Sequence, residues 1–118
     1  MEPNVTILLP VHNDERWISM CLESITRQSF SHFKCIVGFN GTKDNSKEIF
    51  DTVCGNDTRF FKVDYGEKSG KSITLNSMLS LVDTEYTCLI DGDDMWHPEK
   101  LLKQIENIAD FDVLGTMT

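Results

Sequence analysis

The chain has 118 residues, 40% of them hydrophobic, and it carries a formal net charge of -8 at pH 7. That length predicts a single domain over residues 1–118, with one core and no room for a second. The acidic balance argues against nucleic acid and anionic membranes as partners, because phosphate surfaces favour proteins with clustered Lys and Arg.

The cysteines and the N-terminal segment indicate the cellular compartment in which the protein is expected. Cys21, Cys35, Cys54 and Cys88 show no C-x-x-C spacing, which favours buried free thiols in a reducing compartment over disulfides or zinc ligands. The first residues include an acid where a signal peptide has basic residues, and no stretch approaches the ~20 apolar residues that span a bilayer. We therefore expect no transmembrane segment and a cytoplasmic location, either free or at the cytoplasmic face of a membrane.

In the first half of the chain, apolar residues switch between strand-like and helical spacing. Residues 5–9 (VTILL) form a continuous apolar run, typical of a strand that is buried on both faces of a parallel sheet. Asn13 or Asp14 can cap a helix that ends near Gln28. A second strand is predicted over residues 33–39 and a short helix over residues 46–53. The apolar stripe of the first helix consists of Trp17, Ile18, Cys21, Leu22 and Ile25.

The second half continues the alternation. Strands are predicted over residues 59–63, 86–90 and 111–114, with a helix that begins near Gly70 and another near Pro98. The apolar stripe of the third helix consists of Ile73, Leu75, Met78, Leu79 and Val82, and that of the fourth of Leu101, Leu102, Ile105 and Ile108.

This order of elements predicts an α/β, Rossmann-like fold, in which a mostly parallel sheet carries helices on both faces. Ligands of such sheets bind beyond the carboxyl ends of the strands, where the strand order reverses. The polar segments PVHN, NGTKD, YGEKSGK and DGDD all follow predicted strands. We expect them to converge on one rim of the sheet.

The segment YGEKSGKS at residues 65–72 is a near match to a phosphate-binding P-loop. The pattern G-x-x-x-x-G-K-[ST] needs a glycine where Tyr65 stands, and Gly66 comes one residue too late. Because the phosphate cradle depends on loop length, we do not predict a P-loop here. Lys71 and the first amides of the following helix are still expected to face an anionic group.

The segment LIDGDDMWHP gathers acids at the end of a hydrophobic strand. Asp91, Asp93 and Asp94 would repel one another there, and a cation is the simplest remedy. Carboxylate oxygens suit Mg²⁺ or Mn²⁺, which bind through one or two protein carboxylates together with the phosphates of a ligand. The alternative is that these aspartates only form a turn and cap the helix that follows.

Four segments together resemble the N-terminal half of a family 2 glycosyltransferase with the GT-A fold. They are PVHN, LESITRQSFSHFKCIV, GKSITLN and LIDGDDMWHPEKL. The resemblance implies a metal-dependent enzyme that binds a nucleotide-diphosphate sugar, with UDP as one candidate nucleotide. It would transfer the sugar to the hydroxyl of a saccharide or other acceptor, with inversion.

Carried over to this chain, the resemblance implies a nucleotide pocket lined by Pro10, His12 and Asn13. The family often has a tyrosine at position 12. It also usually has an acidic pair where Phe39 and Asn40 stand here, and the second acid commonly bonds the base. The amide of Asn40 can still accept a hydrogen bond and also offers a donor, so we expect base recognition with an altered preference.

The acidic loop and the third helix complete the implied donor site. Asp93 would lie near the ribose, Asp91 would belong to the same site, and Asp94 would hold the Mn²⁺ or Mg²⁺ that bridges the diphosphate. Lys71 would face the anionic end of the donor. Asp44 matches a later aspartate of the family but is read equally well as a turn or cap residue.

Two residues after the acids have open alternatives. Trp96 could pack beside a sugar or anchor the loop, and His97 could approach the ligand or cap the next helix.

The catalytic base is not identified by the resemblance. In the family this residue lies past the matched region, so we expect it beyond Thr118 and name none within the chain. We accordingly expect a partial domain, truncated before the acceptor half, that self-associates through exposed apolar surface.

Two other kinds of protein are weighed against a glycosyltransferase. A non-catalytic nucleotide-sugar-binding module, complete only with a partner, is the main alternative. A phosphoacceptor signalling domain is disfavoured, because such domains gather acids after the first strand, where this chain has PVHN.

Overall fold

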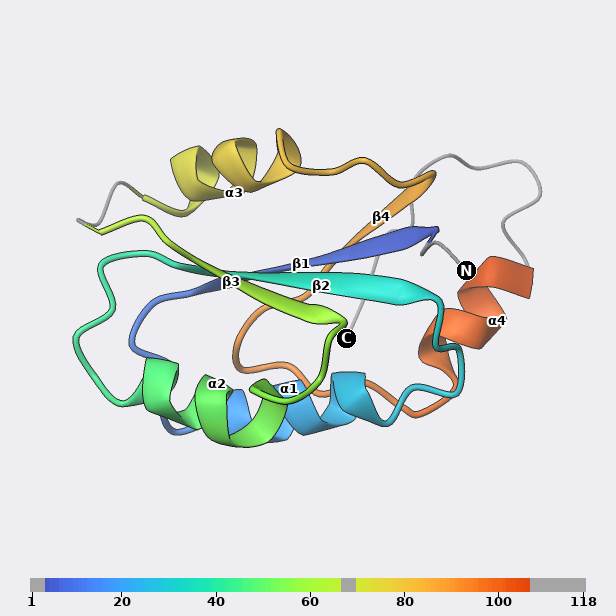
Figure 1. Ribbon diagram of the computed structural model, residues 1–118, viewed down its shortest axis with the longest axis horizontal. Helices are drawn as coiled ribbons and strands as arrows, with labels where there is room; N and C mark the ends of the chain where they lie inside the picture. The colour runs from blue at the N-terminus through green and yellow to red at the C-terminus, as the bar shows by residue number, and fades with distance from the viewer. Residues whose placement is uncertain (1–3, 67–69, 107–118) are drawn as a thin grey trace.

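The computed structural model describes residues 4–66 and 70–106, which form a four-stranded parallel sheet with helices around it (Figure 1). The strands are β1 (Val5–Val11), β2 (Phe33–Phe39), β3 (Phe60–Asp64) and β4 (Tyr86–Leu89). The helices are α1 (Ile18–Thr26), α2 (Ser46–Cys54), α3 (Lys71–Leu79) and α4 (Lys100–Glu106). The predicted α/β class is therefore confirmed, and the predicted strand at residues 111–114 lies outside the described residues.

The strand order β3-β2-β1-β4 decides where a ligand can bind. The chain builds outward from β1 to β3 and then returns through α3 to place β4 on the other side of β1. Helices α1 and α2 cover one face of the sheet and α3 covers the other (Figure 1). The order therefore reverses between β1 and β4, which is the position where open α/β sheets hold their ligands.

The main core lies between the central strands and the face covered by α1 and α2. Every residue of the VTILL run is fully buried, because β1 has a strand on each side and helices over both faces. The rings of Phe39 and Phe50 meet edge to face at 6.0 Å and join β2 to α2. All four cysteines are buried and free, as the sequence predicts.

The opposite face has a much smaller core, and the predicted stripe of α3 is only partly correct. Leu8, Ile36 and Met78 form this second cluster. Ile73 and Leu79 are 59% and 47% exposed, although their spacing predicts burial. The reason is that, among the described residues, α3 is the helix that covers this face, so a single side of it meets the sheet.

The first helix also differs from its prediction. It begins at Ile18, because the backbone carbonyl of Asp14 accepts the N–H groups of both Trp17 and Ile18 in a turn that precedes the helix. Trp17 is consequently 46% exposed and lies outside the core stripe, where the sequence wrongly placed it. Arg16 lies over its ring, with the guanidinium carbon 5.3 Å from the ring centre.

None of the helices in the described part of the chain combines the length and apolar character that a membrane crossing requires.

The two faces of α3 give a direct test of how this helix is held. Met78→Ala should lower the free energy of unfolding by about 2–5 kcal/mol, because it empties a fully buried position in the small core. Leu79→Ala, one residue later and half exposed, should change it by less than about 0.5 kcal/mol. Urea unfolding of both variants measures the difference, and equal effects would contradict the observed orientation of α3.

Candidate functional site

A pocket of about 360 Å³ opens at the carboxyl ends of β1, β2 and β4. It is lined by Pro10, Val11, His12, Asp14, Asn40, Asp91, Gly92 and Asp93. Segments that are far apart in the sequence meet here because β1 pairs in parallel with both β2 and β4, so the ends of these strands share one rim. This is the rim on which the sequence predicts that PVHN, NGTKD and DGDD converge.

The wall between β1 and β2 is fixed by backbone pairing. The N–H of Asn40 donates to the carbonyl of Val11 at 2.8 Å, which extends the parallel ladder by one residue. The carbonyl of Asn40 in turn lies 2.7 Å from Nδ1 of His12. Asn40 is 4% exposed, so its backbone and the imidazole of His12 are held together at the mouth of the pocket.

Asp14 is a pocket residue that the sequence suggested only as a helix cap. Its Oδ2 accepts the backbone N–H of His12 at 3.1 Å. Burial raises the pKa of this carboxyl, the hydrogen bond from His12 opposes that effect, and the negative charges of Asp93 and Asp44 raise the pKa further. Its position shortly after a predicted strand was the only signal that could have placed it in the pocket.

The glycine of the acidic loop packs directly against Asp14. A Cβ placed on Gly92 would lie 2.5 Å from Oδ2 and 2.9 Å from Cγ of Asp14. The loop therefore packs directly on the Asp14 side chain, and a residue with a Cβ at this position would force that side chain to shift.

The acidic loop brings its carboxylates together in a tight turn. The N–H of Asp94 donates to the carbonyl of Asp91 at 3.0 Å, and the N–H of Asp91 donates to Oδ2 of Asp94 at 3.3 Å. One carboxylate oxygen from each of Asp91, Asp93 and Asp94 lies within 4.8 Å of the other two. These hard oxygen donors fit Mg²⁺ or Mn²⁺. Among the described residues that line the pocket there is no Lys or Arg.

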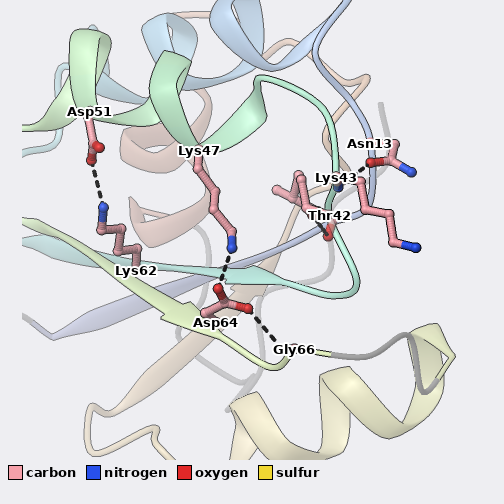
Figure 2. A network of polar contacts seen from close by, with 9 residues as sticks. Asn13, Thr42, Lys43, Lys47, Asp51, Lys62, Asp64 and Gly66 are labelled. Carbon is pink, nitrogen blue, oxygen red and sulfur yellow. Dashed lines mark hydrogen bonds and ion pairs between the residues drawn. The ribbon is translucent and has the colours of Figure 1, made fainter.

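Asn13 holds the loop that follows β2. Its φ of 52° is in the left-handed region that asparagine tolerates, and its side chain points toward that loop (Figure 2). Its Oδ1 accepts the backbone N–H groups of Lys43 at 2.8 Å and Asp44 at 3.3 Å. The described lining of the pocket does not include Asn13, so its predicted contact with a nucleotide stays a prediction.

The loop after β2 also bonds back to the loop after β1. Oδ2 of Asp44 accepts the N–H of Glu15 at 3.0 Å, and Oε2 of Glu15 accepts the N–H of Asn45 at 3.2 Å. Partial burial opposes ionisation of Asp44, but hydrogen bonds donated by Ser46 and Glu15 outweigh it and lower the pKa of this carboxyl. Asp44 therefore acts as a turn residue, which is one of the two alternatives that the sequence left open. Hydrogen bonds between Asp44 and Glu15 and between Glu15 and Asn45 hold the two loops together.

The loop after β3 is attached to α2. Lys47 forms an ion pair with Asp64, whose other oxygen accepts the N–H of Gly66 at 2.9 Å (Figure 2). Lys71 is the first residue of α3, but its side chain lies outside what the structure describes, so the predicted approach of Lys71 to an anion stays a prediction.

Trp96 and His97, for which the sequence left two alternatives each, both stabilise the segment that follows the acidic residues. Trp96 is 3% exposed and belongs to the main core, so it anchors the segment after the acids. Nδ1 of His97 accepts the N–H of Glu99 at 3.2 Å, as expected of a residue that caps the turn before α4.

The structure does not test the predicted position of the catalytic base. The described residues extend to Glu106, and Thr118, beyond which the sequence places the base, lies outside them. The position of the base therefore stays a prediction.

Sequence comparison finds a family model and relatives that match most of this chain. The family model described as Glycosyl transferase family 2 matches residues 6–117. The glycosyltransferase GlyG of Streptococcus pneumoniae is 27% identical over 117 residues, which are 97% of this chain and 38% of that protein. The teichoic acid poly(glycerol phosphate) polymerase of Staphylococcus epidermidis is 34% identical over 91 residues, covering 76% of this chain and 13% of that protein. The chain thus spans less than half the length of these relatives.

Solved structures share the fold. The fragment of S. aureus TarS with residues 1–349, solved in complex with UDP, superposes with a TM-score of 0.82 at 22% identity, covering 92% of this chain and 32% of that one. The mannosyltransferase PcManGT of Pyrobaculum calidifontis, solved with GDP-Man and Mn²⁺, gives a TM-score of 0.84 at 22% identity, covering 93% of this chain and 33% of that one. Both likenesses establish a GT-A fold for the described residues.

The contact between Gly92 and Asp14 can be tested by a double-mutant cycle. Gly92→Ala should destabilise the protein by about 1–3 kcal/mol, because the new methyl group overlaps the Asp14 carboxyl. The φ of Gly92 is not positive, so a clash and not backbone strain would cause the loss. In an Asp14→Ala background the same substitution should cost less, with a coupling of at least about 0.5 kcal/mol in urea unfolding. Additive effects would show that the two residues do not touch.

Proposed function

Since this chain belongs to glycosyl transferase family 2, we propose that it binds a nucleotide-diphosphate sugar and takes part in transferring the sugar to an acceptor hydroxyl, with inversion. The observation that carries the proposal is the pocket at the point where the strand order reverses, with an acidic turn on one side and the loops after β1 and β2 on the other. Relatives solved with UDP and with GDP-Man and Mn²⁺ support this class of donor.

The charge of the pocket supports a requirement for a divalent cation. A diphosphate carries negative charge, and the described residues around the pocket include Asp14, Asp91 and Asp93 but no Lys or Arg. Direct binding would bring like charges together in a partly buried space, where their repulsion is strong. We assign the cation to Asp94, with Asp91 and Asp93 beside it. When bound, Mn²⁺ or Mg²⁺ would neutralise the diphosphate as it leaves the sugar.

We propose the remaining roles from the family resemblance together with the place of each residue in the fold. Pro10, His12 and Asn40 line the pocket where β1 and β2 end, and Asn13 holds the loop after β2. We propose that the nucleotide base binds against these residues. We propose that Asp93, which is exposed on the rim, binds near the ribose, and that Lys71, the first residue of α3, approaches the anionic end of the donor. The residues of this chain thus bind and orient the donor, and we assign none of them as the base that deprotonates the acceptor.

The second candidate is a binding module that holds a nucleotide sugar and acts only together with further protein. Release of UDP from a UDP-sugar in the presence of an acceptor separates the two, because a module binds the donor without consuming it.

Asp94→Asn tests the metal assignment. In the presence of Mn²⁺ we expect its affinity for UDP to fall at least about 10-fold, since a carboxylate ligand is lost. With the metal removed by EDTA, the variant should bind UDP no more weakly than the wild type, because it carries one repulsive charge less. Isothermal titration calorimetry measures both affinities.

The matched control is Glu99→Gln, which changes the net charge equally at an exposed position outside the cluster of Asp91, Asp93 and Asp94. It should leave the gain from Mn²⁺ unchanged. An Asp94→Asn protein that keeps the full gain would refute the assignment.

We also propose that the chain acts in the cytoplasm and self-associates. Apolar side chains are exposed at Leu89 in β4 and at Met95 in the loop that follows. Light scattering at micromolar concentration should therefore give a mass above that of one chain, and Leu89→Ser should lower it. A monomer for the wild type would contradict the proposal.

A further inference from the structure

The acidic loop is connected to α1 by buried polar side chains that the proposed donor site does not include. Gln28, just after α1, is 5% exposed. Its Nε2 donates to the carbonyls of Ser24 at 3.1 Å and His97 at 2.7 Å, and its Oε1 accepts the N–H of Leu101 at 3.0 Å. Two carbonyls on one end and an N–H on the other fix the orientation of the amide.

Ser24 makes a second connection one turn earlier. It is 7% exposed, and its hydroxyl donates to the carbonyl of Cys21 at 2.7 Å and accepts the N–H of Trp96 at 3.1 Å. The N–H of Ser29 also donates to the carbonyl of Pro98 at 2.8 Å. Polar groups of α1 and the residues after it thus hold the backbone that follows the acids.

The segment before the acids is held by the same helix. The thiol of Cys21 lies 3.5 Å from the carbonyl of Asp91, to which it donates. The acidic turn is therefore fastened to α1 on both sides, at Asp91 and at Trp96 and His97. Because residues 91–99 form neither helix nor strand, their backbone groups depend on such partners and not on a ladder of regular bonds.

We propose that Gln28 and Ser24 are positioning residues that set the spacing of Asp91, Asp93 and Asp94 for the divalent cation. This inference rests on the proposed function. Neither side chain lines the described pocket, so both act through the backbone of the loop. Groups that orient the ligands of a metal in this way contribute strongly to its affinity, although they never touch it.

The test compares Gln28→Met with a control of similar kind. Methionine keeps the length of the side chain and removes all of its hydrogen bonds. Thr6→Val is the control, because the hydroxyl of Thr6 is fully buried and bonds to Thr84 at 2.6 Å, in the half of β1 remote from the pocket. Urea unfolding of both variants records how far each destabilises the fold.

Two measurements follow. Calorimetry measures the gain in UDP affinity that Mn²⁺ produces. Gln28→Met should reduce this gain about 10-fold or more, and Thr6→Val should leave it unchanged. Hydrogen–deuterium exchange without ligand should be faster in residues 91–97 of Gln28→Met and unchanged there in Thr6→Val. Ser24→Ala should behave like Gln28→Met and replaces it if that variant does not fold.

The inference is overturned if folded Gln28→Met keeps the gain in UDP affinity from Mn²⁺. It is also overturned if Thr6→Val loses this gain to the same extent, because the loss would then reflect general instability of the fold. If the wild type binds no UDP with Mn²⁺, the proposed function fails, and exchange alone decides the inference. Faster exchange in residues 91–97, in addition to Leu101, whose N–H loses its acceptor in this variant, would then uphold the positioning role. Unchanged exchange in residues 91–97 would refute it.

Discussion

The site depends on the parallel pairing of β1 with β2 on one side and with β4 on the other. The ladder to β2 runs from Val5 to Val11 and continues as far as Asn40, and the ladder to β4 continues through the N–H of Ile90 to the carbonyl of Leu8. Each extension stops where a polar loop begins. The pocket is the space between these loops, so a shift of register in either ladder would separate the residues that line it.

Negative charge is the second constraint, and the fold concentrates it at this rim. Asp14 lies against Gly92, and its raised pKa reflects burial together with the nearby charges of Asp93 and Asp44. Such crowding opposes folding unless hydrogen bonds or a cation offset it. Backbone N–H groups offset part of it at Asp14, Asp44 and Asp94. The proposed cation would offset more, and it would make an acidic pocket suitable for an anionic ligand.

Helix α1 serves both the core and the site. Its apolar side, with Ile18, Leu22 and Ile25, packs under the sheet. Its carboxyl-terminal half and the residues after it direct polar groups toward the acidic loop. There Ser24 and Gln28 bond the backbone groups of the loop, which has no regular secondary structure. The same packing that stabilises the fold therefore also limits the movement of the acidic turn.

The sequence determined the class of fold and most of the rim. Its apolar runs and helical spacings depend on local periodicity, and residues such as Pro10, Asn40 and Asp93 lie at or just after strand ends, so parallel strands had to bring them together. Tertiary structure alone decided the exposure of Trp17, the inclusion of Asp14 in the pocket and the connection of Gln28 to His97. Those outcomes depend on contacts between distant segments, as between Gln28 and His97, which are 69 residues apart, and no local pattern encodes them.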